Sequence, residues 1–261
     1  MFNSIWHTFF FDPVYNGLVF FIDVVPGGDV GVAIILTTIV VKTLLLPFSL
    51  KAAYTQMMMK KIEPEMKEIK EKFKDKREKQ AEAMMKLYKT AGVNPFSSIL
   101  LLFIQIPIII ALYFSVARGG GVPLPDINVD LLYSFVPVPD IVSMLFLGLV
   151  DIAEKSWFLA FLAGATQFVH TRLSMPAPAP KDPNKTEPDF KGDFARSMNM
   201  QMRYVMPVVI FFVAYSISAA IALYFFVSNL TAIAQEYVVR SKGYKDHMKE
   251  DSESNAVAVK D

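Results

Sequence analysis

Lys42 is the residue of this sequence best placed to do chemistry, because it lies in an apolar segment of membrane-spanning length, Gly31 to Leu50. A charge near the centre of a bilayer costs roughly 2.5 to 3.5 kcal/mol, so it normally faces a polar cavity or a partner. A lysine near the end of a span can instead extend its ammonium to the lipid headgroups. At about 1.5 Å per residue, Lys42 lies roughly 18 Å inside a hydrocarbon layer about 30 Å thick. This depth favours the polar cavity.

Further polar side chains occur inside the apolar segments. Taken singly, such residues more often hold helices together than form a site. Their number beside a buried lysine nevertheless predicts a shared, hydrated cavity. The candidates for this cavity, besides Lys42, are Thr38, Gln105, Gln167 and Asn229.

The sequence contains no recognisable catalytic or metal-binding motif. The three histidines are scattered, no HExxH motif occurs, and no pair of intramembrane aspartates suggests a protease. The absence of cysteine excludes disulfides and thiolate metal sites. We therefore expect no enzyme activity, no metal site and no cofactor.

The apolar segments that must position these residues predict the fold class. They are uninterrupted blocks, which is typical of an all-α, polytopic membrane protein. The block Tyr204 to Val239 has 36 residues, about 54 Å of helix, so it is expected to form two helices that turn near residues 216–220. Five transmembrane helices are predicted, at about residues 30–50, 95–116, 157–173, 203–217 and 219–239.

The distribution of basic residues predicts the topology. Residues 1–41 contain no Lys or Arg, whereas residues 51–93 contain twelve. The positive-inside rule places the basic segment in the cytoplasm and the N-terminus outside. With five spans the C-terminus returns to the cytoplasm, although the mixed charges of the tail give no independent support.

Three regions are expected along the chain. Residues 1–28 form an outer segment with an interfacial helix near Val14 to Val25, which is too short to span. Residues 29–240 form the core, and residues 241–261 form a disordered cytoplasmic tail. Within the core, apolar stripes and i,i+4 Glu–Lys pairs predict a helical hairpin over residues 57–91. The hairpin is either a solvated helix pair or a mobile docking element with Met58 and Met59 at its root.

The segment Met84 to Tyr113 (MMKLYKTAGVNPFSSILLLFIQIPIIIALY) resembles the YidC/Oxa/Alb family of membrane-protein insertases. Gly31 to Pro47, with Lys42 where the family usually has arginine, and Pro64-Glu65 of the hairpin are similar to the family as well. So are Leu162 to Phe168 (LAGATQF) and Leu223 to Asn229 (LYFFVSN). The resemblance covers roughly residues 12–240.

This resemblance implies a membrane insertase and chaperone of the bacterial inner membrane. Its hydrophilic groove would open to the cytoplasm and to lipid, and the hairpin residues Met58, Met59, Pro64 and Glu65 would serve docking. Nascent membrane proteins and the lipid bilayer are the implied partners. The Sec translocon and the ribosome are left open as further partners, and no nucleic-acid specificity is expected.

Two alternatives use the same buried charge or the same topology. In a small solute or ion transporter, Lys42 would bind an anion in a path through the protein; this predicts internal repeats, which are not detected. In a scaffold, the hairpin would bind a partner and the spans would have no transport role. Crosslinks of substrates within the groove would distinguish an insertase from a scaffold.

Overall fold

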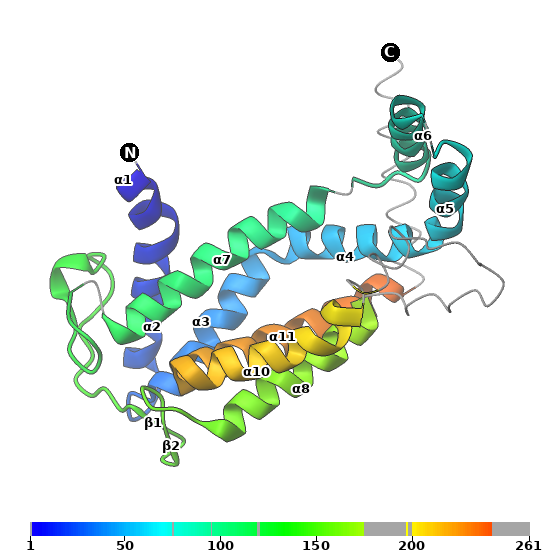
Figure 1. The fold of residues 1–261 in the computed structure, drawn as a ribbon. Coiled ribbons are helices and arrows are strands. Elements are labelled where there is room, and N and C mark those ends of the chain that lie inside the picture. The colour runs from blue at the N-terminus through cyan, green and yellow to red at the C-terminus, as the bar shows by residue number, and fades with distance from the viewer. Residues whose placement is uncertain are drawn as a thin grey trace.

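The computed structural model describes residues 2–74, 76–94, 96–118, 121–174, 197 and 200–241. This part of the chain is mostly helical (Figure 1). Its strands are one short antiparallel pair, β1 (Leu145–Phe146) and β2 (Val150–Asp151). The predicted all-α class is therefore confirmed.

The N-terminal region is a continuous helical segment made of α1 (Phe2–Trp6), η1 (His7–Phe11) and α2 (Asp12–Val24). The interfacial helix was expected within this range. One face of α2 packs against α3 and α7 and is buried. Its apolar members are Val14, Tyr15, Leu18, Val19 and Ile22.

The first predicted span is broken in the structure. Helix α3 covers Val30–Leu44 and α4 covers Leu46–Lys61, with a bend of 68° between them. Pro47 stands in the first turn of α4. A proline has no N–H to donate and its ring crowds the preceding turn, so a straight helix cannot continue through this position. The bend carries the chain away from the apolar bundle towards α5 (Glu63–Lys72) and α6 (Arg77–Thr90).

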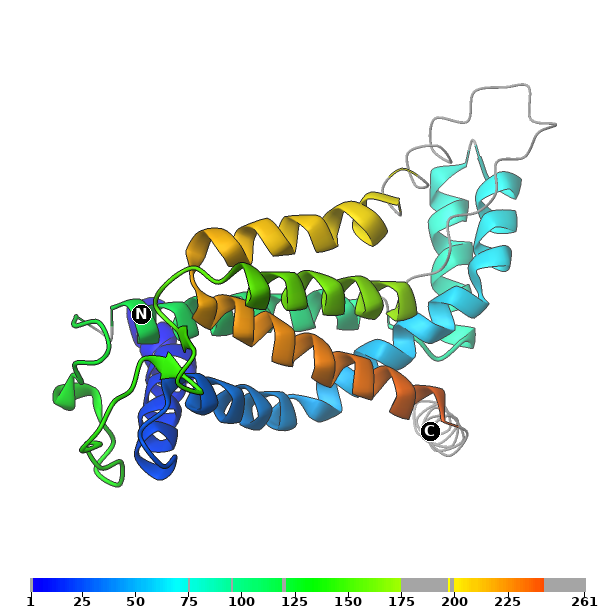
Figure 2. The same cartoon turned by 90° about the horizontal axis from the view of Figure 1, so that it is seen from below.

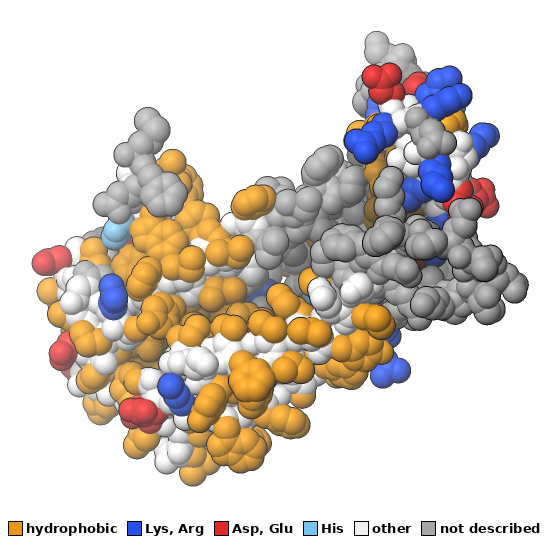
Figure 3. All heavy atoms as spheres, viewed as in Figure 1, with side chains coloured by type: hydrophobic (Ala, Val, Ile, Leu, Met, Phe, Trp, Pro, Cys, Tyr) orange, Lys and Arg blue, Asp and Glu red, His pale blue; other side chains and the backbone are white. Residues whose placement is uncertain are grey.

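Helices α5 and α6 pack against each other, and Gln80 Nε2 donates to the carbonyl of Lys70 at 3.1 Å. Neither helix contains a buried residue. Charged side chains gather over this pair, whereas the helices of the bundle present mostly hydrophobic side chains (Figure 3). Among the latter, Phe103, Trp157 and Phe212 are more than half exposed. A largely apolar surface of this kind suits contact with lipid.

The remaining helices complete the bundle: α7 (Phe96–Ala117), α8 (Trp157–Ser174), η3 (Gln201–Val205), α10 (Met206–Ile217) and α11 (Ala219–Arg240). Helix α8 packs against both α10 and α11, as Figure 2 shows from below. At Gly164 the backbones of α8 and α10 approach closely, because a Cβ there would lie 3.1 Å from the carbonyl oxygen of Pro207. Ser218 is extended and separates α10 from α11 within the turn expected near residues 216–220.

The number of membrane spans remains a prediction. Among the described residues, α11 is long and apolar enough to cross a bilayer by itself, and α3 with α4 qualifies when the bent pair is counted as one span. Phe103–Ala117 and Gln201–Ile217 are apolar but shorter.

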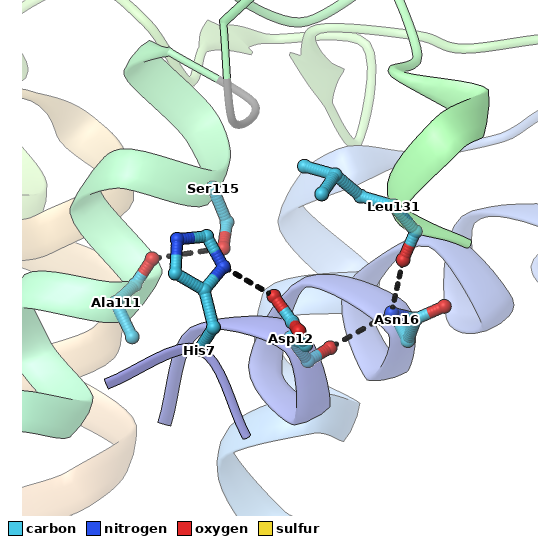
Figure 4. Close-up of polar contacts among 6 residues, drawn as sticks. All are labelled: His7, Asp12, Asn16, Ala111, Ser115 and Leu131. Carbon is cyan, nitrogen blue, oxygen red and sulfur yellow. Dashed lines mark hydrogen bonds and ion pairs between the residues drawn. The ribbon is translucent and has the colours of Figure 1, made fainter. Parts of the chain in front are cut away.

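One end of the bundle, which we call the loop end, is covered by residues 121–156. Asn16 of α2 fastens this loop, because its Nδ2 donates to Leu131 O at 2.9 Å and its Oδ1 accepts from Tyr133 N at 2.6 Å. The same Nδ2 also donates to Asp12 O, and Asp12 in turn contacts His7 at 2.8 Å (Figure 4). The loop is thus held by a polar side chain on the buried face of a helix.

Candidate functional site

Lys42 lies in the last turn of α3, just before the bend. Its ammonium Nζ donates to Gln105 Oε1 of α7 at 3.1 Å, and Gln105 Nε2 donates to the hydroxyl of Tyr224 on α11. Tyr224 is only 2% exposed. A chain of polar groups therefore joins three helices in the apolar bundle, and Lys42 is its charged member.

Lys42 also lines a groove of about 260 Å³ between α3, α4 and α11. The α11 side contributes Thr231 and Gln235, and Thr43 adds a hydroxyl beside Lys42. The other lining residues are apolar: Ile39, Leu46, Leu50, Ala234 and Val238. The wall of the groove is thus mainly apolar; Lys42 is its charged residue, and the hydroxyls of Thr43 and Thr231 donate to carbonyls of their own helices. The groove can attract and solvate a polar or acidic segment, and it can contact an apolar one.

Three other predicted site residues form hydrogen bonds within their own helix or to a neighbouring helix. Thr38 is 2% exposed and donates to Ile34 O in its own helix at 2.7 Å. Gln167 Nε2 donates to Thr171 Oγ1, one turn further along α8, at 3.1 Å. Asn229 is buried between α11 and α8, where its Nδ2 donates to Ala163 O at 3.2 Å. Of the candidates in the described part of the chain, the structure brings Gln105 to Lys42 and places these three outside the groove lining.

The predicted docking residues lie near the junction of α4 and α5. Met58 and Met59 are partly buried in the last turn of α4. Pro64 and Glu65 are exposed in the first turn of α5. A proline is favoured at a helix start, and an acidic residue there complements the helix dipole. This placement explains both residues structurally and leaves their docking role a prediction.

Sequence reasoning did not assign two residues near the site. Tyr224 lies inside an apolar helix. The sequence indicates a polar contact there, because a buried tyrosine hydroxyl usually needs a hydrogen-bond partner. His170 of α8 was regarded as an isolated histidine, yet it interacts electrostatically with both Lys42 and Glu236. The described residues contain no group of three or more potential metal ligands.

Comparison with known proteins decides the family. The model of the family described as "60Kd inner membrane protein" matches residues 21–247. The chain belongs to this family. The predicted resemblance to the YidC insertases is thereby confirmed, and membership identifies the chain as a membrane protein.

Three relatives show the extent of the similarity. "Membrane protein insertase YidC" of Clostridium acetobutylicum is 33% identical over 239 residues, which cover 88% of this chain and 80% of the relative. "Membrane protein insertase YidC 2" of Bacillus anthracis is 28% identical over 247 residues, 93% of this chain and 84% of the relative. "Membrane protein insertase YidC" of Oleidesulfovibrio alaskensis is 32% identical over 237 residues; the match covers 90% of this chain but 39% of that longer relative.

Proposed function

We propose that this chain inserts integral membrane proteins into the bilayer and helps them to fold. The observation that carries the proposal is the position of Lys42, a charged side chain that lines a groove inside a membrane-protein bundle. The family's named relatives are membrane protein insertases, which supports the same function. None of the three is named as a transporter, so the transporter alternative has no support, and the family is not a known enzyme class.

The groove lowers the cost of moving a polar segment into the membrane. A polar group that enters bare hydrocarbon without a hydrogen bond costs several kcal/mol. Lys42 attracts acidic or polar segments of the substrate and hydrates the groove. Gln235 and the hydroxyl oxygens of Thr43 and Thr231 can exchange hydrogen bonds with the substrate. The apolar helix of the substrate then moves sideways into lipid, and burial of its apolar surface supplies the driving force.

The proposed orientation places the loop end outside and α5 with α6 in the cytoplasm. The support is the basic composition of residues 51–93 together with the hydrogen-bonded closure of the loop end. In this orientation the chain would cross the membrane five times, and α3 and α4 would together form the first span. Nascent membrane proteins and lipid are then the partners of the groove.

The test is insertion of a small single-span substrate with an acidic N-terminal tail into liposomes that contain only the purified full chain. We expect the wild type to insert the substrate and Lys42→Ala to reduce insertion about tenfold, equivalent to ~1.4 kcal/mol. Lys42→Arg keeps the charge and should retain most activity. Lys51→Ala is the matched control, because Lys51 is an exposed lysine of α4 outside the groove lining.

Two outcomes would contradict parts of the proposal. Equal insertion by wild type and Lys42→Ala would remove Lys42 from the mechanism. Failure of the wild type to insert, followed by success when the Sec translocon is added, would replace autonomous insertion by assistance to that translocon.

A further inference from the structure

Arg203 is a buried cation outside the groove. It lies in η3 just before α10 and is 9% exposed. Its Nε and Nη1 atoms have no hydrogen-bond partner in the described part of the chain. An arginine stays charged at every physiological pH, and a buried charged donor without an acceptor is costly. The position therefore calls for an acceptor with negative charge.

Two further cations lie at the same end of the bundle, where α8 ends. Lys60 Nζ of α4 donates to Leu173 O at 2.7 Å, and Arg240 Nη2 of α11 donates to the same carbonyl. The segment that carries Arg203 packs against the same helix, since the ring of Tyr204 lies 6.2 Å from the ring of Phe168 on α8.

Glu236 of α11, an acid at this end of the bundle, is already engaged. Glu236 is 4% exposed, its Oε1 accepts from Ser174 Oγ at 2.9 Å, and its Oε2 accepts from Arg240 Nε at 3.4 Å. Lys60 and Arg240 thus share this end of the bundle with one carboxylate, whose two oxygens already accept from Ser174 and Arg240. Among the described residues, this end of the bundle thus carries more positive than negative charge, and Arg203 has unpaired donors there.

We propose that Arg203 and Lys60 bind the phosphate group of an anionic membrane lipid. A guanidinium matches phosphate in both charge and geometry, and basic pockets between membrane helices are suited to anionic headgroups. A lipid fits better than a free phosphate, because exposed apolar side chains follow Arg203 directly along the same helical segment: Val205, Val208 and Val209. They give the acyl chains a surface beside the headgroup. The inference requires the membrane position of this end but does not require insertase activity.

Native mass spectrometry of the full chain in detergent tests the site, with titration of dioleoyl phosphatidylglycerol and of zwitterionic dioleoyl phosphatidylcholine. We expect tighter binding of phosphatidylglycerol by the wild type. Arg203→Gln should weaken that binding about tenfold and leave phosphatidylcholine binding unchanged. Arg203→Lys should retain most of the preference. Arg172→Gln is the matched control, since Arg172 is an exposed arginine near the same end of α8, and it should leave the preference unchanged.

Equal affinity of the wild type and Arg203→Gln for phosphatidylglycerol would overturn the proposal. Loss of the lipid preference on addition of millimolar inorganic phosphate would also overturn it, because free phosphate would then occupy the site. If Arg203→Gln does not fold, Lys60→Gln gives the decision: weaker phosphatidylglycerol binding supports the site, and unchanged binding refutes it. A purely structural role for Arg203 would alter thermal stability but not the difference between the two lipids.

Discussion

The two ends of the helical bundle are held together in different ways. At the loop end, backbone groups form hydrogen bonds: Ser143 N donates to Gly28 O at 2.8 Å, and Val30 N donates to Ser143 O at 3.0 Å. The same loop reaches the α10–α11 turn, where Ala219 N donates to Glu154 O at 2.7 Å. At the opposite end, which we call the basic end, long cationic side chains of α4 and α11 cap the end of α8.

This difference concerns the reach and the flexibility of the groups that hold each end. Backbone hydrogen bonds have short reach and fixed geometry, so they hold the loop against the bundle. Side chains of lysine and arginine are long and flexible, so the basic end can hold charges without filling the space between the helices. The groove with Lys42 lies between α3, α4 and α11, beside the bend that leads to the basic end.

The largest effect is expected where the loop end is tightest. Gly28 has φ +64°, and a Cβ there would lie 1.9 Å from Ile141 O. Gly28→Ala should lower the free energy of unfolding by at least about 3 kcal/mol, since the left-handed backbone cost adds to a clash with backbone. Thermal unfolding in detergent measures this. Gly27→Ala is the control: φ is +79° with nothing within 4 Å, so the loss should stay near 1 kcal/mol. Equal losses would show that the loop does not press on Gly28.

A smaller effect is expected from the polar anchor of the same loop. Asn16→Ala removes the hydrogen bonds to Leu131 and Tyr133 and should cost about 2 kcal/mol. Hydrogen exchange of the amides in residues 128–136 should become faster. The control is Ser115→Ala, because buried Ser115 bonds only within its own helix, to Ala111 O, in the described contacts (Figure 4). If exchange of the loop does not change in Asn16→Ala, the loop is held by its backbone contacts alone.

A substitution in the polar chain of Lys42, Gln105 and Tyr224 should have a still smaller effect on stability. Tyr224→Phe removes the hydroxyl that accepts from Gln105 and keeps the ring, so stability should fall by about 1 kcal/mol. The liposome assay should show a smaller loss of insertion than for Lys42→Ala, because the charge remains. An equal loss would mean that Lys42, Gln105 and Tyr224 act as one unit.

The smallest effect is expected on the surface of the basic end. Lys67 and Glu63 form an exposed i,i+4 pair at 2.9 Å. Glu63→Gln should change stability by less than about 0.5 kcal/mol, since water screens exposed pairs. Thermal unfolding at low and high salt provides the measurement. A loss comparable to that of Tyr224→Phe would show that α5 carries a structural role beyond its own helix.

The sequence alone determined the class of this protein, its family and its most unusual residue. Long apolar blocks and segregated basic residues are local properties, so they predict helices in a membrane without any knowledge of contacts. Motifs such as Met84 to Tyr113 identified the family for the same reason. The cost of a charge in hydrocarbon pointed to Lys42 before its surroundings were known.

Only the tertiary structure decided what each polar side chain contacts. A helical polar residue can turn to its own backbone, to a neighbouring helix or to a cavity, and the packing of other helices selects among these. Thr38, Gln167 and Asn229 were therefore indistinguishable from Gln105 in sequence, yet Gln105, 63 residues away, is the one that bonds to Lys42. The burial of Arg203 depends in the same way on long-range packing, which no local pattern records.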